Sequence, residues 1–219
     1  MKNNQESTGY EIAVLGANGG IGRQVVELAL KEGHKVTAIL RNPANMTLQH
    51  ENLVIVKGDI LDPESIAAHL ENKDAVISAI GKNSVKRTTL YSQGSQNLIE
   101  LLKNTNSKRV FFISASGLEV NPTHSLQIQL LTRFVLQKIL RHMYTDLRKM
   151  EGIVKQCGLE WTIMRPPQLT DKALTGNYRF EVNHFLPNAL KISRADLAHF
   201  ILHNVGNQQI IKATVEVAY

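Results

Sequence analysis

Short apolar runs alternate along this chain with longer stretches that carry apolar residues at helical spacing. Runs rich in Val, Ile or Phe predict strands over Glu11–Leu15, Lys35–Leu40, Leu53–Val56, Ala75–Ala79, Arg109–Ser114, Glu160–Met164 and Ile211–Val217. The stretches between them predict helices over Gly20–Glu32, Pro63–Leu70 and Leu90–Lys103. This alternation predicts an α/β fold, with a doubly wound parallel sheet and helices on both of its faces.

The second half of the chain carries further helix signals. The stretch Leu126–Gln156 is too long for one unbroken helix of ordinary length, so we expect a bend near Met143–Asp146. Ser193-Arg-Ala-Asp196 has the spacing of a capping box, with Asp in place of Glu, and predicts a helix that ends at His203. Earlier in the chain, Asp62 is a good N-cap for the second helix.

Composition places the chain among ordinary globular proteins. Its 219 residues are enough for one substantial hydrophobic core but too few for two independent ones. Of these residues, 43% are hydrophobic and 20% are charged, which is typical of a folded globular protein. We therefore expect one domain over residues 10–219, after a disordered polar tail at residues 1–9. The tail lacks the apolar stretch of a signal peptide, and no run approaches the ~20 apolar residues of a membrane helix. These observations predict a cytoplasmic protein without a membrane partner.

Charge and metal-ligand patterns exclude several classes of function. The net charge of +6 favours anionic partners, but no basic tract concentrates it, so we expect no nucleic-acid partner. A phosphate-bearing small molecule explains the modest excess as well as a nucleic acid would, and scattered solvated lysines are favoured over both. The single cysteine, Cys157, has no neighbour at metal-ligand spacing, and the eight histidines do not cluster, so no metal site is expected.

A glycine-rich loop follows the first expected strand directly and opens the first expected helix. It consists of Gly16, Ala17, Asn18, Gly19, Gly20, Ile21 and Gly22. We expect Gly16 to permit the tight turn, Gly19 to let the backbone approach a pyrophosphate, and Gly22 to let the helix pack close to the sheet. Backbone N–H groups and the helix dipole would then bind the phosphates. This context predicts a Rossmann-type dinucleotide site, and the Gly-x-x-Gly-x-x-Gly spacing is typical of short-chain dehydrogenase/reductases.

The end of the second strand bears on the choice of nucleotide. NAD enzymes usually place an acidic residue there, which would repel a 2′-phosphate, whereas this chain has Arg41. NADP(H) is therefore favoured over NAD(H), although Arg41 as a solvated loop charge remains the alternative. Other residues expected to border the adenine and ribose follow the third and fourth strands: Asp59, Ile60, Ala79, Ile80 and Gly81. Asp59 could equally cap the helix near Pro63.

The catalytic pair of the main short-chain dehydrogenases is absent. Those enzymes use Tyr-x-x-x-Lys, in which the lysine lowers the pKa of the tyrosine for proton exchange. Here Tyr144 is followed four residues later by Arg148, and no lysine stands at that offset from Tyr10, Tyr91, Tyr178 or Tyr219. This absence counts against ordinary alcohol–ketone chemistry by that mechanism.

The remaining motifs resemble the atypical short-chain dehydrogenases, and more narrowly the NmrA-like and biliverdin-reductase-B/flavin-reductase group. Besides the glycine loop, the resemblance rests on Leu40-Arg41, Lys57-Gly-Asp59, Arg165-Pro-Pro167, Leu174-Thr-Gly176-Asn-Tyr178 and Ile192-Ser-Arg194-Ala-Asp196. It covers nearly the whole chain after Gly9. The resemblance implies a Rossmann fold, a bound nicotinamide cofactor and a planar acceptor such as a flavin.

The resemblance also implies positions for the reacting end of the cofactor. Ser114 would lie near the nicotinamide, and Pro166 to Leu169 would pass beside its carboxamide. Lys149 falls where some atypical members place a basic residue near the nicotinamide ribose. Flavin-reductase relatives carry a histidine after the two prolines, but this chain has Gln168, which can hydrogen-bond and cannot titrate near neutral pH. The candidate catalytic residues are therefore Ser114, Lys149 and Gln168, with a proton-donor role for Gln168 in doubt.

These observations favour an NADPH-dependent reductase that delivers hydride to a flavin, a quinone or a similar planar acceptor. Such acceptors need orientation above all, because they are already electrophilic. The aromatic residues of Leu169–Pro187 could wall the acceptor or simply pack a surface hairpin; they are Tyr178, Phe180, His184 and Phe185. A nucleotide-sensing regulator without turnover is the alternative, and a sugar epimerase ranks last. Monomer and homodimer both stay open.

Overall fold

The computed structural model describes residues 9–82 and 84–219 and is built on one large sheet. The strand order is β3-β2-β1-β4-β5-β6-β10-β8, and every neighbouring pair is parallel except β10 with β8. These strands are β1 (Glu11–Leu15), β2 (Lys35–Leu40), β3 (Leu53–Lys57), β4 (Ala75–Ser78), β5 (Arg109–Ile113), β6 (Glu160–Met164), β8 (Arg179–Val182) and β10 (Ala213–Ala218). Strands β7 (Gln168–Thr170) and β9 (Lys191–Ser193) pair separately. The order reverses between β1 and β4, which confirms the predicted Rossmann-type sheet.

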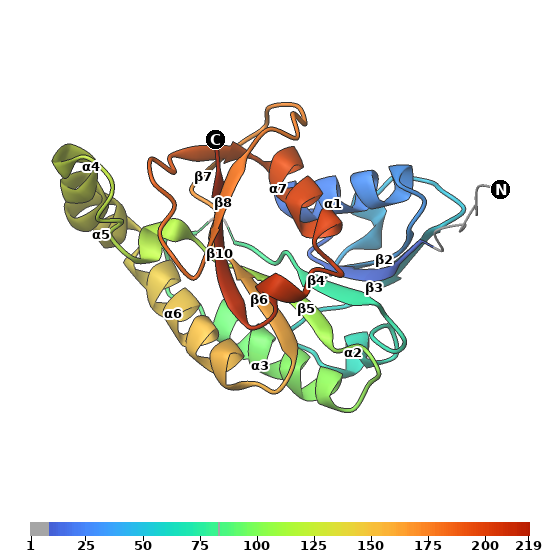
Figure 1. The fold of residues 1–219 in the computed structure, drawn as a ribbon. Helices are drawn as coiled ribbons and strands as arrows, with labels where there is room; N and C mark the ends of the chain where they lie inside the picture. Colours follow the sequence, from blue (N-terminus) through green and yellow to red (C-terminus); the bar gives the residue numbers. More distant parts are fainter. Residues whose placement is uncertain (1–8, 83) are drawn as a thin grey trace.

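Helices cover both faces of this sheet (Figure 1). They are α1 (Gly20–Lys31), α2 (Glu64–Ala67), α3 (Leu90–Lys103), α4 (Leu126–Leu131), α5 (Gln137–Ile139), α6 (Arg141–Gln156) and α7 (Arg194–His203). Helices α1 and α7 pack together on one face, and α3 and α6 pack together on the other. Short 3₁₀ turns lie at Pro43–Asn45, Ser116–Leu118 and Gln208–Ile210.

Strand β1 shows why the apolar runs predicted the sheet. Ile12 and Val14 belong to the core beneath α1 and α7, while Ala13 and Leu15 belong to the core beneath α3 and α6. Successive side chains of a strand point to opposite faces, so a strand covered on both faces must be apolar throughout. Strands of this kind therefore appear in the sequence as continuous runs. The predicted bounds are confirmed within one residue for β1 to β6, including the partly exposed edge strand β3.

The predicted start of α7 is confirmed, with one difference in the cap. The Ser193 hydroxyl accepts a hydrogen bond from the backbone N–H of Asp196 at 2.9 Å, as a capping box requires. The Asp196 carboxylate accepts hydrogen bonds from the backbone N–H groups of Thr175 and Gly176 and from the Tyr219 hydroxyl. This shorter side chain thus holds the 175–176 turn and the last residue against α7.

The second helix is shorter than predicted and is capped differently. Helix α2 covers only Glu64–Ala67 of the expected Pro63–Leu70, and its first flanking residue is Pro63. The Asp62 side chain makes no cap; its backbone carbonyl accepts a hydrogen bond from the N–H of Ser65 at 3.1 Å. The prediction of an Asp62 N-cap was therefore wrong, because the chain turns tightly between β3 and α2.

The long helical stretch breaks earlier than predicted. The break lies at Leu140, where the backbone leaves helical geometry (φ −93°, ψ 15°), and residues 143–146 are regular helix. Asp146 accepts hydrogen bonds from the backbone N–H groups of Tyr91 and Ser92 at the start of α3, so that part of α6 is tied to the body. The helix therefore breaks where it leaves the body, with a π-helical turn at Thr132–Leu136 before the break.

Two further predictions concern the ends of the chain and membranes. Residues 1–8, which hold most of the predicted disordered tail, lie outside the described residues. Over residues 9–82 and 84–219, no helix combines the length and the apolarity needed to cross a membrane.

Candidate functional site

The glycine loop connects β1 to α1 at the carboxyl edge of the sheet. Gly16 has φ +74°, and a Cβ atom there would lie 2.7 Å from the carbonyl oxygen of Ala79. Another residue would be strained at this position and would also collide with the backbone that directly follows β4. A Cβ atom on Gly22 would overlap the backbone carbonyl of Gly16, so this glycine lets the first turn of α1 lie directly on the loop. The sequence therefore holds the start of α1 close to the end of β1.

A cavity of about 800 Å³ runs along the carboxyl ends of the strands, over this loop. Ligands of open α/β sheets bind at this edge, where the strand order reverses. Most of the residues predicted to bind the cofactor line it: Gly16, Asn18, Gly19, Gly20, Ile21, Arg41, Asp59, Ile60, Ala79, Ile80, Gly81, Ser114, Pro166 and Leu169. The fold thus brings together residues from six separate segments of the chain.

One end of the cavity lies beside β2 and β3. The exposed Arg41 directly follows β2, and Asn42 and Asn45 of the next turn line the same wall. Asp59 lines the wall from the β3 side, and its carboxylate also accepts a hydrogen bond from the backbone N–H of Leu61 at 3.0 Å. Asp59 therefore orders the turn before α2 while it borders the cavity.

A second cation lies over the glycine loop and was missed in the sequence. Arg194, the first residue of α7, lines the cavity, and its Nε would lie 2.5 Å from a Cβ atom on Gly20. Its Nη1 pairs with the exposed carboxylate of Asp171 at 2.6 Å. The sequence signal is present, because the motif around Arg194 is both a capping box and one of the motifs of the family resemblance, but neither assigns Arg194 to the cavity. The packing of α7 against α1 brings this guanidinium to the phosphate-binding loop.

The other end of the cavity, beside β5 and β6, is mainly apolar. Its walls include Ile113, Ala115, Met143, Leu147, Pro166 and Pro167. The hydroxyl of Ser114 lies among them and donates a hydrogen bond to Oε1 of Glu151 at 2.7 Å. An ionised carboxylate can only accept, so the single proton of Ser114 is directed away from the cavity. Toward a ligand, Ser114 therefore presents lone pairs and acts as a hydrogen-bond acceptor.

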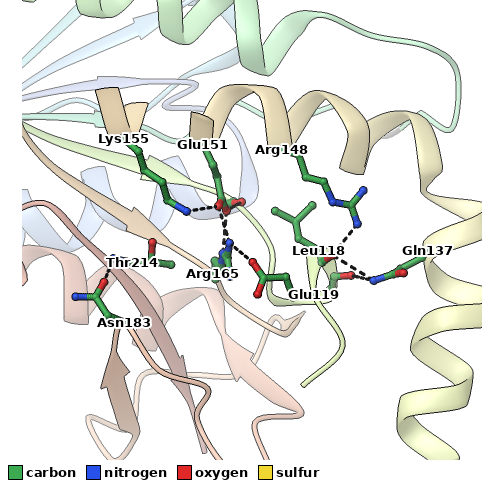
Figure 2. A network of polar contacts seen from close by, with 11 residues as sticks. Leu118, Glu119, Gln137, Arg148, Glu151, Lys155, Arg165, Asn183 and Thr214 are labelled. Atoms are coloured by element: carbon green, nitrogen blue, oxygen red, sulfur yellow. Dashed lines mark hydrogen bonds and ion pairs between the residues drawn. The ribbon is translucent and has the colours of Figure 1, made fainter. Parts of the chain in front are cut away.

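Glu151 is held by a buried ion-pair network behind this wall (Figure 2). Arg165 donates from Nε to Oε1 of Glu151 at 2.9 Å and from Nη2 to Oε2 at 2.6 Å, a bidentate pair. The same Nη2 also lies 2.8 Å from Oε1 of Glu119, and Lys155 lies 3.4 Å from Glu151. Glu151 and Arg165 are both buried, so the pair is shielded from water. The network fixes the orientation of Ser114 at the cavity wall.

These contacts set the protonation of Glu151. Burial alone would raise the pKa of its carboxyl, but the hydrogen bonds and charge of Arg165, with smaller effects from Ser114 and Lys155, lower the pKa below its usual value. Burial lowers the pKa of the Arg165 guanidinium. Its two carboxylate partners, Glu151 and Glu119, raise the pKa by more than burial lowers it, so the net shift is upward. The pair is ionised at neutral pH, which keeps Glu151 an acceptor for the Ser114 proton.

The lowered pKa predicts how Glu151 stabilises the fold at different pH. A carboxyl with a lowered folded-state pKa stabilises above its unfolded value of about 4.3, and this stabilisation is lost as the pH falls through the folded value. At pH 7 we expect a larger free energy of unfolding for the wild type than for Glu151→Gln. Below about pH 4 the difference between the two proteins should shrink. Urea unfolding of both proteins between pH 3 and 7 measures it, and a constant difference would contradict the prediction. Comparing the two proteins removes the effect of Glu216, whose pKa is raised by burial.

Two of the three candidate catalytic residues do not line the cavity. Lys149 is exposed on the outer side of α6 and lines a separate groove with Ser92, Gln93 and Gln96. Gln168 is exposed on β7, where its backbone N–H donates to the carbonyl of Leu190 at 3.2 Å. The expectation that Lys149 lies near the nicotinamide ribose is corrected, because the face of α6 toward the cavity carries Met143 and Leu147.

The aromatic residues predicted to wall an acceptor lie elsewhere. Tyr178 and Phe180 pack against Phe200 of α7, with ring centres 5.9 and 5.1 Å away, and the Tyr178 hydroxyl lies 2.7 Å from Nδ1 of His199. Phe180 belongs to β8, an edge strand that the sequence did not predict. Phe185 and His184 are likewise not part of the cavity wall over the described residues. Of the two alternatives that the sequence leaves open, Tyr178 and Phe180 therefore fit ordinary packing, here against α7, and not an acceptor wall.

Tyr144 has no catalytic position either. Its side chain is buried beside Gly117, and burial raises the pKa of its hydroxyl. Arg148, which stands where the catalytic lysine would be, donates from Nη2 to the carbonyl of Leu118 at 2.6 Å. The missing Tyr-x-x-x-Lys pair of the sequence thus corresponds to a tyrosine and an arginine that support the loop after β5.

Comparison with known proteins places this site in a family. The model of a family described as NAD(P)H-binding matches residues 16–208. The chain therefore belongs to this NAD(P)H-binding family, as the glycine loop and the strand order independently indicate. The resemblance to the atypical short-chain dehydrogenase and flavin-reductase group is confirmed.

The similarity to individual relatives extends over nearly the whole chain. Uncharacterized protein YwnB of Bacillus subtilis (strain 168) is 26% identical over 91% of this chain and 93% of its own length. The structure of SP1627 from Streptococcus pneumoniae TIGR4, "a putative NADH-flavin reductase", is 29% identical, covers 96% of this chain and 99% of its own, and has a TM-score of 0.78. A short-chain dehydrogenase/reductase from Veillonella parvula DSM 2008, solved in complex with NADP, shares the fold at 17% identity, over 96% and 94% of the two chains, with a TM-score of 0.78. Some curated relatives are longer, and the chain spans 47% and 37% of two of them.

Proposed function

We propose that this protein is an NADPH-dependent reductase that delivers hydride to a flavin, a quinone or a similar planar acceptor. The observation that carries the proposal is the single cavity that joins the glycine loop and Arg41 at one end to the apolar wall around Ser114 at the other. A dinucleotide laid along it would place its phosphates on the loop, beneath Arg194, and its nicotinamide beside β5 and β6. When bound, the reduced nicotinamide supplies the hydride.

The residues around Ser114 suit this role through orientation. The carboxamide of a nicotinamide offers N–H donors, and Ser114 presents only lone pairs toward the cavity, so the two are complementary. Met143, Leu147 and the two prolines offer apolar surface against which a planar ring can stack and from which water is excluded. A flavin or quinone is already electrophilic and can take its proton from solvent. The chemistry therefore does not require the Tyr–Lys pair that the chain lacks.

A turnover assay tests the proposal and separates it from the nucleotide-sensing alternative. Purified protein is mixed with NADPH and a panel of flavins, quinones and dyes, and oxidation of NADPH is followed by its absorbance. We expect turnover with at least one planar acceptor, and slower turnover with Ser114→Ala than with wild type. Tight NADPH binding without turnover across the panel would overturn the reductase and favour a sensor, whose partner would then be sought by pull-down with NADP⁺ and NADPH.

A further inference from the structure

A helical arm projects from the body of the protein (Figure 1). It covers residues 126–139, that is α4, the π-helical turn and α5, and it lies beyond the start of α6. Its base is fastened by Gln137, whose side-chain amide donates to the carbonyls of Gly117 and Leu118 at 3.1 and 3.2 Å (Figure 2). The rest of the arm extends away from both hydrophobic cores.

The arm exposes large apolar side chains on several sides. Those of at least 37% exposure are Leu126, Leu130, Leu131, Phe134, Val135, Leu136 and Ile139. Single exposed apolar residues are ordinary on a protein surface, but a contiguous group of them marks a surface that binds something. Half of the exposed large hydrophobic residues among the described residues lie in these fourteen positions. The arm therefore has an apolar surface that the other described residues, 9–82, 84–125 and 140–219, leave uncovered.

The charges of the arm and its base have one sign. From Val120 to Thr145 the sequence has no Asp or Glu, while Arg133, Lys138 and Arg141 are all present and exposed. The guanidinium carbon of Arg133 lies 5.7 Å from the ring centre of Phe134, and Nζ of Lys138 lies 5.9 Å from it. Two cations thus flank an aromatic ring that is 51% exposed. This combination is complementary to an apolar layer bordered by anionic groups.

We propose that the arm docks on an anionic lipid surface. Phe134, Leu131 and their apolar neighbours would enter the boundary between headgroups and acyl chains, while Arg133 and Lys138 would meet lipid phosphates. A second copy of this chain fits less well, because two identical arms would bring cations together with no carboxylate between them. The arm is also a projection, and a protein partner would need a matching groove. This surface contact revises the expectation of no membrane partner, which rested on the absence of spanning segments.

The position of the arm connects it to the cavity. Arg141 begins α6 just after the arm, and Met143 on the first turn of that helix lines the apolar end of the cavity. A lipid surface held by the arm would therefore lie near the end of the cavity where we place the acceptor, which favours an acceptor dissolved in lipid. This consequence rests on the proposed function, whereas lipid binding itself does not, so the test below measures binding without turnover.

Vesicle co-sedimentation of the full chain tests the proposal. We expect binding to phosphatidylcholine vesicles that contain phosphatidylglycerol, weaker binding to pure phosphatidylcholine, and loss of binding at high salt. Each cation near an anionic membrane contributes about fivefold in affinity, so Arg133→Gln/Lys138→Gln should bind about 30-fold more weakly. Leu131→Asp/Phe134→Asp should lose at least about tenfold, because it removes buried apolar surface and adds repulsion.

Matched variants separate these effects from general changes of charge and stability. Lys31→Gln/Lys103→Gln removes two exposed cations far from the arm, and Val54→Asp/Leu190→Asp places two carboxylates at sites 58% and 48% exposed. Both controls should bind like wild type. Equal binding to the two vesicle types, or no binding to either, would overturn the proposal. A dimer that Leu131→Asp/Phe134→Asp converts to monomer, without vesicle binding, would also overturn it and assign the arm to a second copy.

Discussion

Replacing Glu151 by alanine is expected to lower the free energy of unfolding by about 3–5 kcal/mol, which is the usual cost of leaving one partner of a buried ion pair uncompensated. Arg165 would keep its charge in a site with 10% side-chain exposure, with the exposed Glu119 as its remaining carboxylate partner. For a domain of this length, such a loss corresponds to a fall in Tm of about 10 °C. Urea and thermal unfolding measure the change.

Glu119→Ala is the matched control, because Glu119 pairs with the same Nη2 atom of Arg165. Its carboxylate lies 2.8 Å away, against 2.6 Å for Glu151, but its side chain is 51% exposed. Exposed ion pairs contribute about 1 kcal/mol or less, so we expect a loss of that size. Equal losses for the two variants would contradict the structure, since distance to Arg165 alone would then determine stability and burial would not matter.

The double variant Glu151→Met/Arg165→Met tests what the pair does. Well-packed apolar residues often replace a buried ion pair at little cost, so the double variant should be more stable than Glu151→Ala alone. It would also release the Ser114 hydroxyl from its fixed orientation. We therefore expect slower NADPH turnover from the double variant even where its fold is retained, because the network positions Ser114.

The sheet could be predicted from the sequence because the burial of each strand requires apolar residues within that strand itself. Each strand that is covered on both faces must be apolar throughout, and the glycine loop must follow the first strand for backbone and phosphate to meet. No residue pattern near Leu140 predicts the break of the helix there. The part of α6 that follows the break is held to the body by hydrogen bonds that Asp146 accepts from the backbone N–H groups of Tyr91 and Ser92, more than fifty residues earlier in the chain. Contacts of this range are not visible in a local sequence pattern.

The candidate site likewise combines residues that local sequence places and residues that only long-range packing brings to the cavity. The residues that follow strands, such as Arg41, could be placed from the sequence because parallel strands end at one edge. Arg194 could not, since only the packing of α7 on α1 brings it to Gly20. Lys149 was misplaced by resemblance, although helix geometry argued against it. Residues 147 and 151 point toward the sheet, and position 149 lies about 200° around the helix from each.

Removing the charge of Arg41 should change the choice of nucleotide more than any other single substitution in the cavity. A hydrogen bond to a charged group contributes about 1.5–3 kcal/mol, so Arg41→Ala should weaken NADPH binding about 10- to 100-fold. NADH has no 2′-phosphate, and its Kd should change by less than about threefold. Titration calorimetry with both nucleotides measures the two constants. Equal losses would mean that Arg41 is a solvated loop charge and does not select the nucleotide.

Arg194→Gln should weaken the binding of both nucleotides, because the pyrophosphate that we propose to lie beneath Arg194 is common to NADPH and NADH. Both Kd values should rise by a similar factor, again about tenfold or more. Asp171→Asn is the control, since it breaks the 2.6 Å pair with Arg194 but leaves the cation in place, and it should keep or improve binding. Arg41 follows β2 and Arg194 begins α7, and among the described residues they have no partner in common, so their effects on NADPH binding should add in the double variant. For NADH the double variant should match Arg194→Gln alone, because a cation that contacts only the 2′-phosphate contributes nothing to a nucleotide that lacks it.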